Sequence, residues 1–404
     1  MNIKDLTYKK EIKYIFRGHD LLFNVSQMLF GSHEIDIGTH HLLRLIELQK
    51  IDSFRKVLDL GAGYGPIGIS LNKFLPSSEV HMVDRDSLAI EYCKINSELN
   101  NVQNVKIYES LGYDDVVDTD FDLIISNIPA KVGDRVLTYL LTEAGYYLCP
   151  GGQVMIVVID AIVQHVTQVL TNNENIKILF QKKWPGYTVF QYEFLKYDHT
   201  KREILGNAFD RGIFDRENID FVIGNRHVSV LTTYGLSEFD SLGFDTQLLL
   251  NELNTIQGKD IKEALVFNPG QGYIPLSAVS TAHIENMSII DRNLQALRIT
   301  RRNLITNGYP DSCIRLLNQS DLSTDSNIKF DCIMGIFEVK EPQKVHEHLL
   351  KQAINLLNND GFIILVSSST VITRLEKTIQ ESKLTQKVRR IKSKGNSVVI
   401  LKLK

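Results

Sequence analysis

An internal duplication, with a period of about half the chain, constrains the fold of these 404 residues more than any other feature. Residues 84–100 read DRDSLAIEYCKINSELN, and residues 291–307 read DRNLQALRITRRNLITN. A shift of 207 positions superimposes the two segments and also places Gly63 on Gly270. An ordered series of matches at nearly one offset is typical of a repeated unit. The sequence therefore predicts two copies of one domain in tandem.

The extent of the matches sets the bounds of the two copies. They run over about 20–197 and 228–404. A chain of this length holds two domains of ordinary size. We therefore expect a first domain at 1–197, which includes an N-terminal extension, then a linker at 198–227 and a second domain at 228–404.

Strands and helices alternate within each copy. In the first copy, short apolar strands at 56–60 and 80–84 precede helical stretches at 67–74 and 87–100. Strands that alternate with helices of about 10–15 residues are typical of a parallel sheet with helices on both faces. A turn at 184–187 then leads into a closing strand. The expected fold class is α/β, with two doubly wound, mostly parallel sheets that each end in an antiparallel closing strand.

Composition excludes several other classes of protein. Hydrophobic residues make up 43% of the chain, which is enough for two packed cores. The sequence has no run of about 18 apolar residues, so no membrane span is expected. The first residues lack the basic and apolar pattern of a signal peptide, which favours the cytoplasm. The four cysteines form no CxxC pair, and we expect no metal site.

A glycine-rich loop follows the first strand, because residues 59–66 read DLGAGYGP. Glycines after a strand let the backbone approach a ligand closely. Asp84 ends the next strand and could accept hydrogen bonds from ribose hydroxyls. The spacing from Gly63 to Gly68 also fits the GxGxxG pattern of dinucleotide binding, but Asp59 would repel a pyrophosphate and attract a cationic amino-acid group. The expected cofactor-binding residues are Asp59, Gly61, Gly63, Gly65, Asp84 and Arg85.

A second signal lies at the end of the fourth strand, where residues 121–130 read FDLIISNIPA. The Asn127 side chain and a backbone carbonyl in a proline-stiffened turn can aim two acceptors at one point. Two such acceptors would hold an exocyclic amine by its N–H groups and direct its lone pair at an electrophilic methyl group, which is positioning rather than acid–base catalysis. A plain loop that ends a strand is the alternative. The expected catalytic residues are Asn127, Ile128 and Pro129.

These residues resemble the class I S-adenosylmethionine-dependent methyltransferases. More narrowly, they are similar to the small-domain group that includes the RsmC-type ribosomal RNA guanine-N2 methyltransferases. Three stretches carry the likeness: FGSHEIDIGT at 30–39 with Leu42-Leu43, the glycine loop at 59–65, and SNIP at 126–129. The resemblance implies S-adenosylmethionine as the cofactor and two tandem Rossmann-like domains, one of them degenerate. It also implies methyl transfer to the exocyclic amine of a guanine in structured RNA.

Two positions depart from the family pattern. Ile128 stands where the family has the first proline of its NPP motif, and it still offers a backbone carbonyl. Ala130 stands where the family has an aromatic residue that stacks on the target base. Stacking contributes about 1–3 kcal/mol per base. Trp184 or Tyr187 is a candidate to supply the missing ring.

The second copy keeps the signals of the fold and loses those of the chemistry. The counterparts of Asp59 and Asn127 are Val266 and Ile336, and Asn268 stands at the position of a loop glycine. We expect this copy to be catalytically inactive and to dock RNA or shield the first domain. The resemblance places the degenerate copy first in RsmC-type enzymes, so the order here is reversed.

Charge is distributed unevenly along the chain. The net charge is −3, yet residues 351–404 contain eleven Lys and Arg against three acids, which gives this segment +8. Its densest stretch is RRIKSK at 389–394. A basic surface of this kind suits RNA phosphates, although a solvated charged face is an equally ordinary reading.

The expected function is that of an S-adenosylmethionine-dependent N-methyltransferase of guanine in ribosomal RNA, with the RNA contacted through the basic second domain. Two alternatives stay open. One is methylation of a small molecule or a protein amide, which the alanine at position 130 favours. The other is a non-catalytic RNA-binding or assembly protein that keeps the methyltransferase fold.

Overall fold

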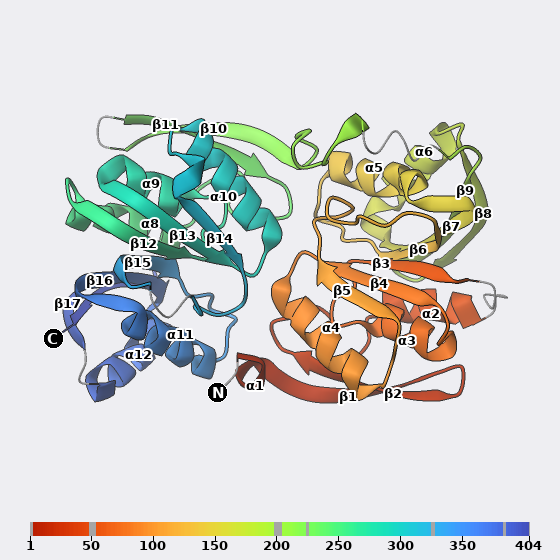
Figure 1. Cartoon of the computed structure of the whole chain (residues 1–404), viewed down its shortest axis with the longest axis horizontal. Helices are drawn as coiled ribbons and strands as arrows, with labels where there is room; N and C mark the ends of the chain where they lie inside the picture. Colours follow the sequence, from red (N-terminus) through yellow and green to blue (C-terminus); the bar gives the residue numbers. More distant parts are fainter. Residues whose placement is uncertain are drawn as a thin grey trace. The chain divides into compact units, whose positions relative to one another are not determined.

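The computed structural model describes residues 3–47, 54–197, 204–223, 226–324, 328–382 and 385–403. The chain forms two compact units (Figure 1). The first unit is Tyr8–Asp215, and the second is Arg216–Lys404 together with Met1–Thr7. Each contains a seven-stranded sheet and a two-stranded hairpin. In the described part of the chain, no helix is both long enough and apolar enough to cross a membrane.

The first unit has a seven-stranded sheet in the order β5-β4-β3-β6-β7-β9-β8. Strands β5, β4, β3, β6 and β7 are parallel, while β9 is antiparallel to both β7 and β8. The expected doubly wound sheet with an antiparallel closing strand is confirmed. Its elements are β1 (Tyr8–Phe16), β2 (His19–Ser26), α2 (Ile37–Glu47), β3 (Lys56–Leu60), α3 (Pro66–Phe74), β4 (Glu79–Asp84), α4 (Ser87–Leu99), β5 (Val105–Glu109), β6 (Phe121–Asn127), α5 (Asp134–Thr142), β7 (Leu148–Ile159), α6 (Val163–Asn172), β8 (Ile176–Trp184) and β9 (Tyr187–Phe194).

Helices cover both faces of this sheet (Figure 1). Alternate strand residues such as Val57, Val80 and Ile125 pack against α2, α3 and the β1–β2 hairpin in one apolar core. Helices α5 and α6 lie on the opposite face. Parallel strands buried on both faces must be apolar almost throughout, and β3 and β6 follow that rule except for Lys56 and Asp122 near their starts and a few polar residues near their carboxyl ends. The polar residues at the carboxyl ends are the candidates for a site.

The second unit repeats this architecture, with the strand order β14-β13-β12-β15-β16-β18-β17. Strands β14, β13, β12, β15 and β16 are parallel, and β18 is antiparallel to β16 and β17. The duplication is therefore structural as well as sequential. The elements are α1 (Ile3–Thr7), β10 (Asp215–Ile223), β11 (Arg226–Thr233), α8 (Phe244–Glu252), β12 (Asp260–Phe267), α9 (Tyr273–Thr281), β13 (His283–Asp291), α10 (Leu294–Thr306), β14 (Ile314–Asn318), β15 (Phe330–Ile336), α11 (Gln343–Leu356), β16 (Leu357–Ser368), α12 (Ser369–Ser382), β17 (Thr385–Ser393) and β18 (Asn396–Leu403).

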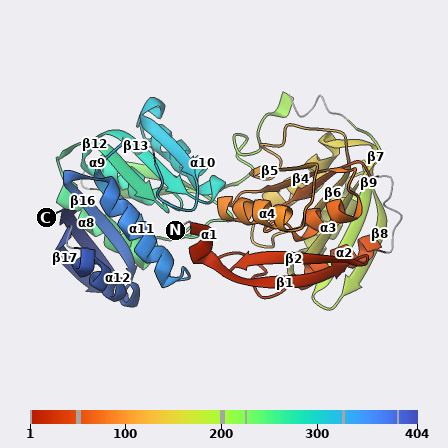
Figure 2. The same ribbon diagram turned by 60° about the horizontal axis from the view of Figure 1, so that its bottom comes forward.

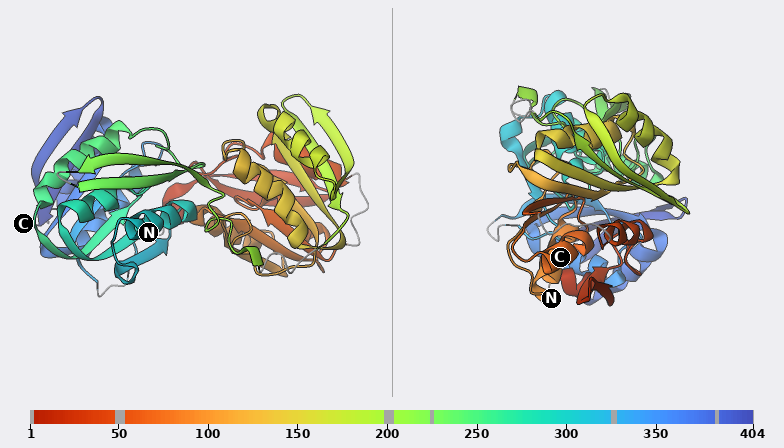
Figure 3. Two further views of the ribbon diagram at one scale, coloured as in Figure 1. Left: turned by 90° about the horizontal axis from the view of Figure 1, so that it is seen from above. Right: turned by 90° about the vertical axis from the view of Figure 1, so that its right-hand side faces the viewer.

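The duplication also includes the two hairpins, which the sequence matches did not reveal. In the first unit, the hairpin packs along α3 and α4 (Figure 2), and Asn96 Oδ1 accepts from the Asn24 backbone N–H at 2.7 Å. In the second unit, the β10–β11 hairpin packs along α10 (Figure 3), and Asn303 Oδ1 accepts from the Leu231 N–H at 2.9 Å. Both contacts obey the shift of 207.

The segment expected to be a linker therefore has structure of its own. Strand β10 and the start of β11 fall within 198–227. The residues before them belong to the first unit, because the Asp114 carboxylate accepts from the backbone N–H groups of Ala208 and Phe209 at 2.7 and 3.0 Å. Residues 198–203 and 224–225 lie outside the described part. The equivalence of the two hairpins could not be seen in the sequence, because backbone hydrogen bonds form a hairpin even where the side chains are not similar.

Candidate functional site

The topology of the first unit brings the glycine loop and the Asn127 turn together. The chain runs from β3 outward through β4 to β5 and then returns to β6 on the other side of β3. In doubly wound sheets, ligands bind at the carboxyl ends of the strands where the order reverses in this way. The Ser126 hydroxyl, near the end of β6, donates to the Leu60 carbonyl at 2.6 Å. The two predicted signals therefore lie at the ends of adjacent strands.

The glycine loop is held by bonds to β4 and is open on its outer side. The backbone N–H groups of Gly61 and Ala62 both donate to the Val83 carbonyl, at 2.8 and 2.9 Å. Gly61 and Gly63 have φ angles of 79° and 57°, which favour glycine. A Cβ added to either residue would meet no protein atom within 4 Å. The loop is thus a cradle with free space beside its backbone.

Asp59 lies beneath this loop rather than at its surface. It is 0% exposed, and its Oδ2 accepts from the backbone N–H of Gly68 in the first turn of α3 at 2.8 Å. Its Oδ1 has no hydrogen-bond partner among the described residues. Burial raises the pKa of this carboxyl group to about 7. In this position the carboxylate fixes the start of α3, because alternate residues of β3 face the α3 layer. The expected contact with a cationic group stays a prediction.

Asp84 and Arg85 lie at the end of β4 beside the loop. Asp84 Oδ2 accepts from the Gly63 N–H at 2.9 Å, and its Oδ1 accepts from the Asp86 N–H at 3.0 Å. Burial raises the pKa of Asp84 and lowers that of the Arg85 guanidinium. Each carboxylate oxygen can accept more than one hydrogen bond, so Asp84 can brace the loop and still receive a hydroxyl group of a ligand.

Asn127 ends β6 with its amide held from one side. Its Nδ2 donates to Asp36 Oδ2 at 2.8 Å and to the Thr39 hydroxyl at 3.0 Å. Among the described residues, its Oδ1 makes no hydrogen bond. The backbone N–H of Ile128 donates to the Val157 carbonyl at 3.0 Å, which fixes the following turn, and Pro129 is exposed. The turn therefore presents an amide oxygen and a backbone carbonyl from an anchored segment.

Asp36 and Thr39 are functional candidates that the sequence reasoning missed. In the sequence both residues belong to the 30–39 pattern, which by itself assigns them no role. Asp36 precedes α2 and its Oδ2 accepts from the Thr39 N–H at 3.2 Å, which is the geometry of a helix N-cap. The capping pattern alone could have located the helix start, but the contact with a residue 91 positions away could not be read from it.

Aromatic side chains gather beside the first turn of α2. The His41 and Trp184 rings are stacked with their centroids 4.7 Å apart, and the Tyr187 ring lies edge-on to His41 at 6.0 Å. A Cβ added to Gly38 would lie 2.9 Å from the Tyr187 ring, so the ring packs closely on that turn. Burial lowers the pKa of His41, which favours its neutral form. The two candidates for the ring missing at Ala130 therefore lie together.

The glycine loop of the second unit follows the same backbone path. Asn268, Gly270 and Gly272 have φ angles of 49°, 58° and 92°, against 79°, 57° and 93° at the corresponding positions of the first unit. The interactions beneath the loop differ. Val266 stands in place of the acid that accepts from the α3 helix, and Pro275, which has no N–H, stands in place of the donor. The second unit therefore lacks both the carboxylate that accepts this hydrogen bond and the N–H group that donates it.

The strand ends of the second unit are filled by side chains. The Phe267 ring lies so close to Gly335 that an added Cβ would be 2.5 Å from it. Phe337 is 1% exposed, and its ring centroid lies 5.3 Å from those of Phe267 and His346. Asn268 Nδ2 also donates to the carbonyl of Ile336 at 2.9 Å, which bridges β12 and β15. These contacts leave an apolar plug at the switch point.

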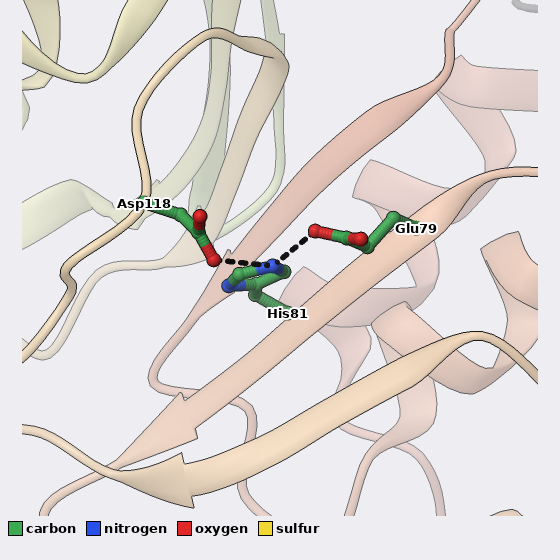
Figure 4. A group of neighbouring side chains, drawn as sticks. All are labelled: Glu79, His81 and Asp118. Carbon is green, nitrogen blue, oxygen red and sulfur yellow. Dashed lines mark hydrogen bonds and ion pairs between the residues drawn. The ribbon is translucent and has the colours of Figure 1, made fainter.

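A histidine with two carboxylates lies at the other end of the first sheet (Figure 4). His81 Nε2 is 2.8 Å from Glu79 Oε1 and 3.3 Å from Asp118 Oδ2. Lys106 Nζ lies 3.2 Å from Glu79 and 2.9 Å from Asp118, so an ammonium group balances these acids. Glu79 begins β4 whereas the glycine loop lies at its far end. This network belongs to the scaffold.

A glycine cradle and an oriented amide at the switch point define the first unit as a doubly wound ligand-binding enzyme domain. The chain belongs to the methyltransferase small-domain family, whose model matches residues 20–197 and 227–396. It is 30% identical over 151 residues to the uncharacterised protein YbxB of Bacillus subtilis, covering 37% of this chain and 74% of that one. It is 38% identical over 133 residues to ribosomal RNA small subunit methyltransferase C of Haemophilus influenzae, covering 32% and 39%.

One solved structure matches nearly the whole chain. It is the T. thermophilus 16S rRNA N2 G1207 methyltransferase (RsmC) in complex with AdoMet and guanosine, with a TM-score of 0.67, 15% identity, and coverage of 98% of this chain and 99% of that one. At this identity the likeness establishes the tandem fold. The H. influenzae enzyme is matched over about two fifths of its length, so the activity of the whole relative is not carried over with the family.

Proposed function

We propose that the first unit is an S-adenosylmethionine-dependent N-methyltransferase that acts on the exocyclic amine of a guanine in ribosomal RNA. The observation that carries the proposal is the Asn127 amide, whose Oδ1 is unbonded among the described residues next to an open glycine loop. Membership of the methyltransferase small-domain family supports the reaction class. The printed names of the H. influenzae relative and the T. thermophilus neighbour support the substrate class. A ribosomal RNA substrate would place the enzyme in the cytoplasm.

The residues of the loop fit the proposed cofactor. The space beside Gly61 and Gly63 is free of protein atoms, which a backbone-lining ligand requires. Gly65 completes the turn, Asp84 would accept the ribose hydroxyls, and Arg85 borders the same strand end. The cofactor would supply an electrophilic methyl group on a sulfonium. Asp59 would act indirectly, by holding α3 and the loop in place.

The Asn127 turn would orient the amine. The exocyclic nitrogen of guanine carries two N–H groups, and Asn127 Oδ1 and the Ile128 carbonyl would accept one each. Pro129 stiffens the turn, and the Ile128 N–H is already bonded to β7. Acceptance of both N–H groups leaves the nitrogen lone pair directed away from the turn. Such positioning lowers the barrier without a strong base.

The aromatic cluster would supply the stacking surface that Ala130 lacks. His41, Trp184 and Tyr187 lie beside the α2 turn whose Asp36 contacts Asn127. A base would have to be unpaired or flipped out to reach this place. A planar aromatic face accepts any nucleobase, and the amide contact then selects one that carries an exocyclic amine.

The second unit would be inactive and would dock RNA. Its edge strand β17 carries the basic run, but Lys387 and Arg390 pair with Glu376 at 2.8 and 2.6 Å. Lys392 is exposed on the same strand and is the proposed phosphate contact, whereas the exposed Arg389 has its Nη1 3.5 Å from Glu252 Oε2. Basic residues on an edge strand also prevent pairing with other sheets, which is the alternative role. Lys383 and Lys404 of the basic segment lie outside the described residues.

A single labelling experiment tests the proposal. Radiolabelled S-adenosylmethionine is incubated with the protein and, separately, with total RNA, small-molecule and protein fractions. Label in RNA at a guanine N2 supports the proposal. Label in another fraction would reassign the substrate, and failure to bind the cofactor in calorimetry would leave an RNA-binding protein with a methyltransferase fold. Asn127→Ala is the control, since it should bind the cofactor and transfer methyl groups about 10³-fold more slowly.

A further inference from the structure

We propose that Asp36 is a positioning residue that fixes the orientation of the Asn127 amide, so that Oδ1 rather than Nδ2 is presented to the substrate amine. The inference rests on the proposed function. Asp36 acts through Asn127, which its Oδ2 meets at 2.8 Å.

A terminal amide is nearly symmetric in shape. Rotation by 180° exchanges oxygen and NH2 with almost no change in shape, so only hydrogen bonds decide which group points where. A carboxylate can only accept. If Asn127 were flipped, its Oδ1 would face Asp36 Oδ2, and two acceptors would be in contact. The Thr39 hydroxyl, at 3.0 Å, can donate or accept and would tolerate either orientation. Asp36 therefore decides the orientation.

Asp36 is itself held in place before any substrate binds. Its Oδ2 accepts from the Thr39 N–H at 3.2 Å, and its backbone carbonyl accepts from the His40 N–H at 2.8 Å. The Tyr187 ring packs on the same turn next to Gly38. The carboxylate is thus fixed at the start of α2, and little entropy is lost when it holds the amide.

The second unit separates this role from the role of a helix cap. The counterparts of Asp36 and Asn127 are Gly243 and Ile336, so both members of the pair are absent together. The counterpart of Thr39 is Thr246, which is retained and buried. Helix α8 begins after Gly243, which has no side chain to cap it, and the Thr246 N–H donates instead to Asp245 Oδ1 at 3.0 Å. The helix start therefore does not require an acid at the position of Asp36, and the acid at that position accompanies the asparagine.

Asp36→Ser tests the proposal, because serine also caps helices but its hydroxyl is too short to reach Asn127. We expect unchanged affinity for S-adenosylmethionine in calorimetry, a similar melting temperature, and a kcat lower by about 10- to 100-fold. Asp36→Asn, which offers either an acceptor or a donor, should fall between this variant and the wild type. Asn293→Ser replaces the N-cap of α10 in the second unit and should leave kcat unchanged.

Two further measurements make the outcome decisive. Asn127→Ala combined with Asp36→Ser should be no slower than Asn127→Ala alone, because residues that act as one unit are not additive. The side-chain amide protons of Asn127 should exchange with solvent at least about tenfold faster in Asp36→Ser, which NMR detects without turnover. Unchanged exchange, a kcat within twofold of wild type or additive losses would overturn the inference. If Asn127→Ala itself keeps methyl transfer, the proposed function fails, whatever Asp36→Ser does.

Discussion

The two units share a backbone and differ in a small number of hydrogen-bonded pairs. Both have the same strand order and loop φ angles of 57° and 58° at Gly63 and Gly270. In both, an asparagine side chain, Asn96 or Asn303, is hydrogen-bonded to the backbone of the hairpin. The first unit has Asp36 bonded to Asn127, and the second has neither residue. The architecture therefore persists without the polar groups at the switch point, and those groups are the ones that the proposed chemistry needs.

There is a physical reason why both members of a hydrogen-bonded pair are absent from the second unit. A buried donor or acceptor without its partner costs about 1–3 kcal/mol, whereas replacement of both partners by apolar groups is nearly neutral. Asp59 with the N–H of Gly68, in the first unit, corresponds to Val266 with Pro275 in the second. Once the ligand site is not required, both members can change and the fold remains stable. Pairs that are kept only in the first unit are therefore candidates for function.

The largest expected effect comes from giving the first unit the residue of the second at position 127. Asn127→Ile removes the acceptor that would orient the amine, and we expect methyl transfer to fall by about 10³-fold while cofactor affinity is unchanged. Single-turnover kinetics measure the rate of methyl transfer, and calorimetry measures the cofactor affinity. The reverse change, Ile336→Asn, should create no activity, because Phe267 and Phe337 fill the strand ends. Activity gained by Ile336→Asn would contradict the assignment of the second unit as inactive.

The next effect uses a matched pair of glycines. Gly63→Leu places a side chain in the open space of the proposed cofactor cradle, and Gly270→Leu places one beside the equivalent loop. Both positions have nearly the same φ and no protein atom within 4 Å of an added Cβ, so the cost in stability should be similar. We expect the cofactor Kd to rise about 100-fold, or about 2.7 kcal/mol, in Gly63→Leu alone. An equal rise in both variants would mean that backbone strain, rather than ligand contact, is measured.

These comparisons show which parts of the molecule can be predicted from sequence. The mostly parallel sheet with its closing strand and the glycine loop follow from local patterns, because the alternation of elements and the residues after a strand are coded over a few positions. The burial of Asp59 and the contact between Asp36 and Asn127 are not coded locally. They depend on how α2 and α3 pack on the sheet, and the second of them joins residues 91 positions apart. Hairpins β1–β2 and β10–β11 were missed since their equivalence lies in backbone bonds.

A smaller effect is expected from the aromatic cluster. Tyr187→Ala removes a ring beside the Asn127 turn, and its counterpart in the second unit is Asn396. Loss of stacking should weaken binding of a guanine-containing oligonucleotide by about 1–3 kcal/mol, hence roughly tenfold or more, without a change in cofactor affinity. Fluorescence anisotropy with a labelled RNA measures it. Asn396→Ala should have no such effect, and equal weakening in both variants would assign the loss to a change in the sheet rather than to lost stacking on the base.

The last expected effect is a difference between the two units in how stability depends on pH. Burial raises the pKa of Asp59 to about 7 in the folded state, from an ordinary value of 3.8, whereas Val266 cannot titrate. The folded state therefore binds the extra proton between these values, so stability is highest below pH 3.8 with respect to this group and is lost as pH rises through about 7. The slope is on the order of 1 kcal/mol per pH unit. Asp59→Asn keeps an acceptor for the Gly68 N–H and cannot ionise, so chemical denaturation should show a flatter pH dependence from about pH 4 to 7. If the variant keeps the wild-type dependence of unfolding free energy on pH, another group is responsible for it. Asp59 would then not be the cause of a difference in stability between the two loops.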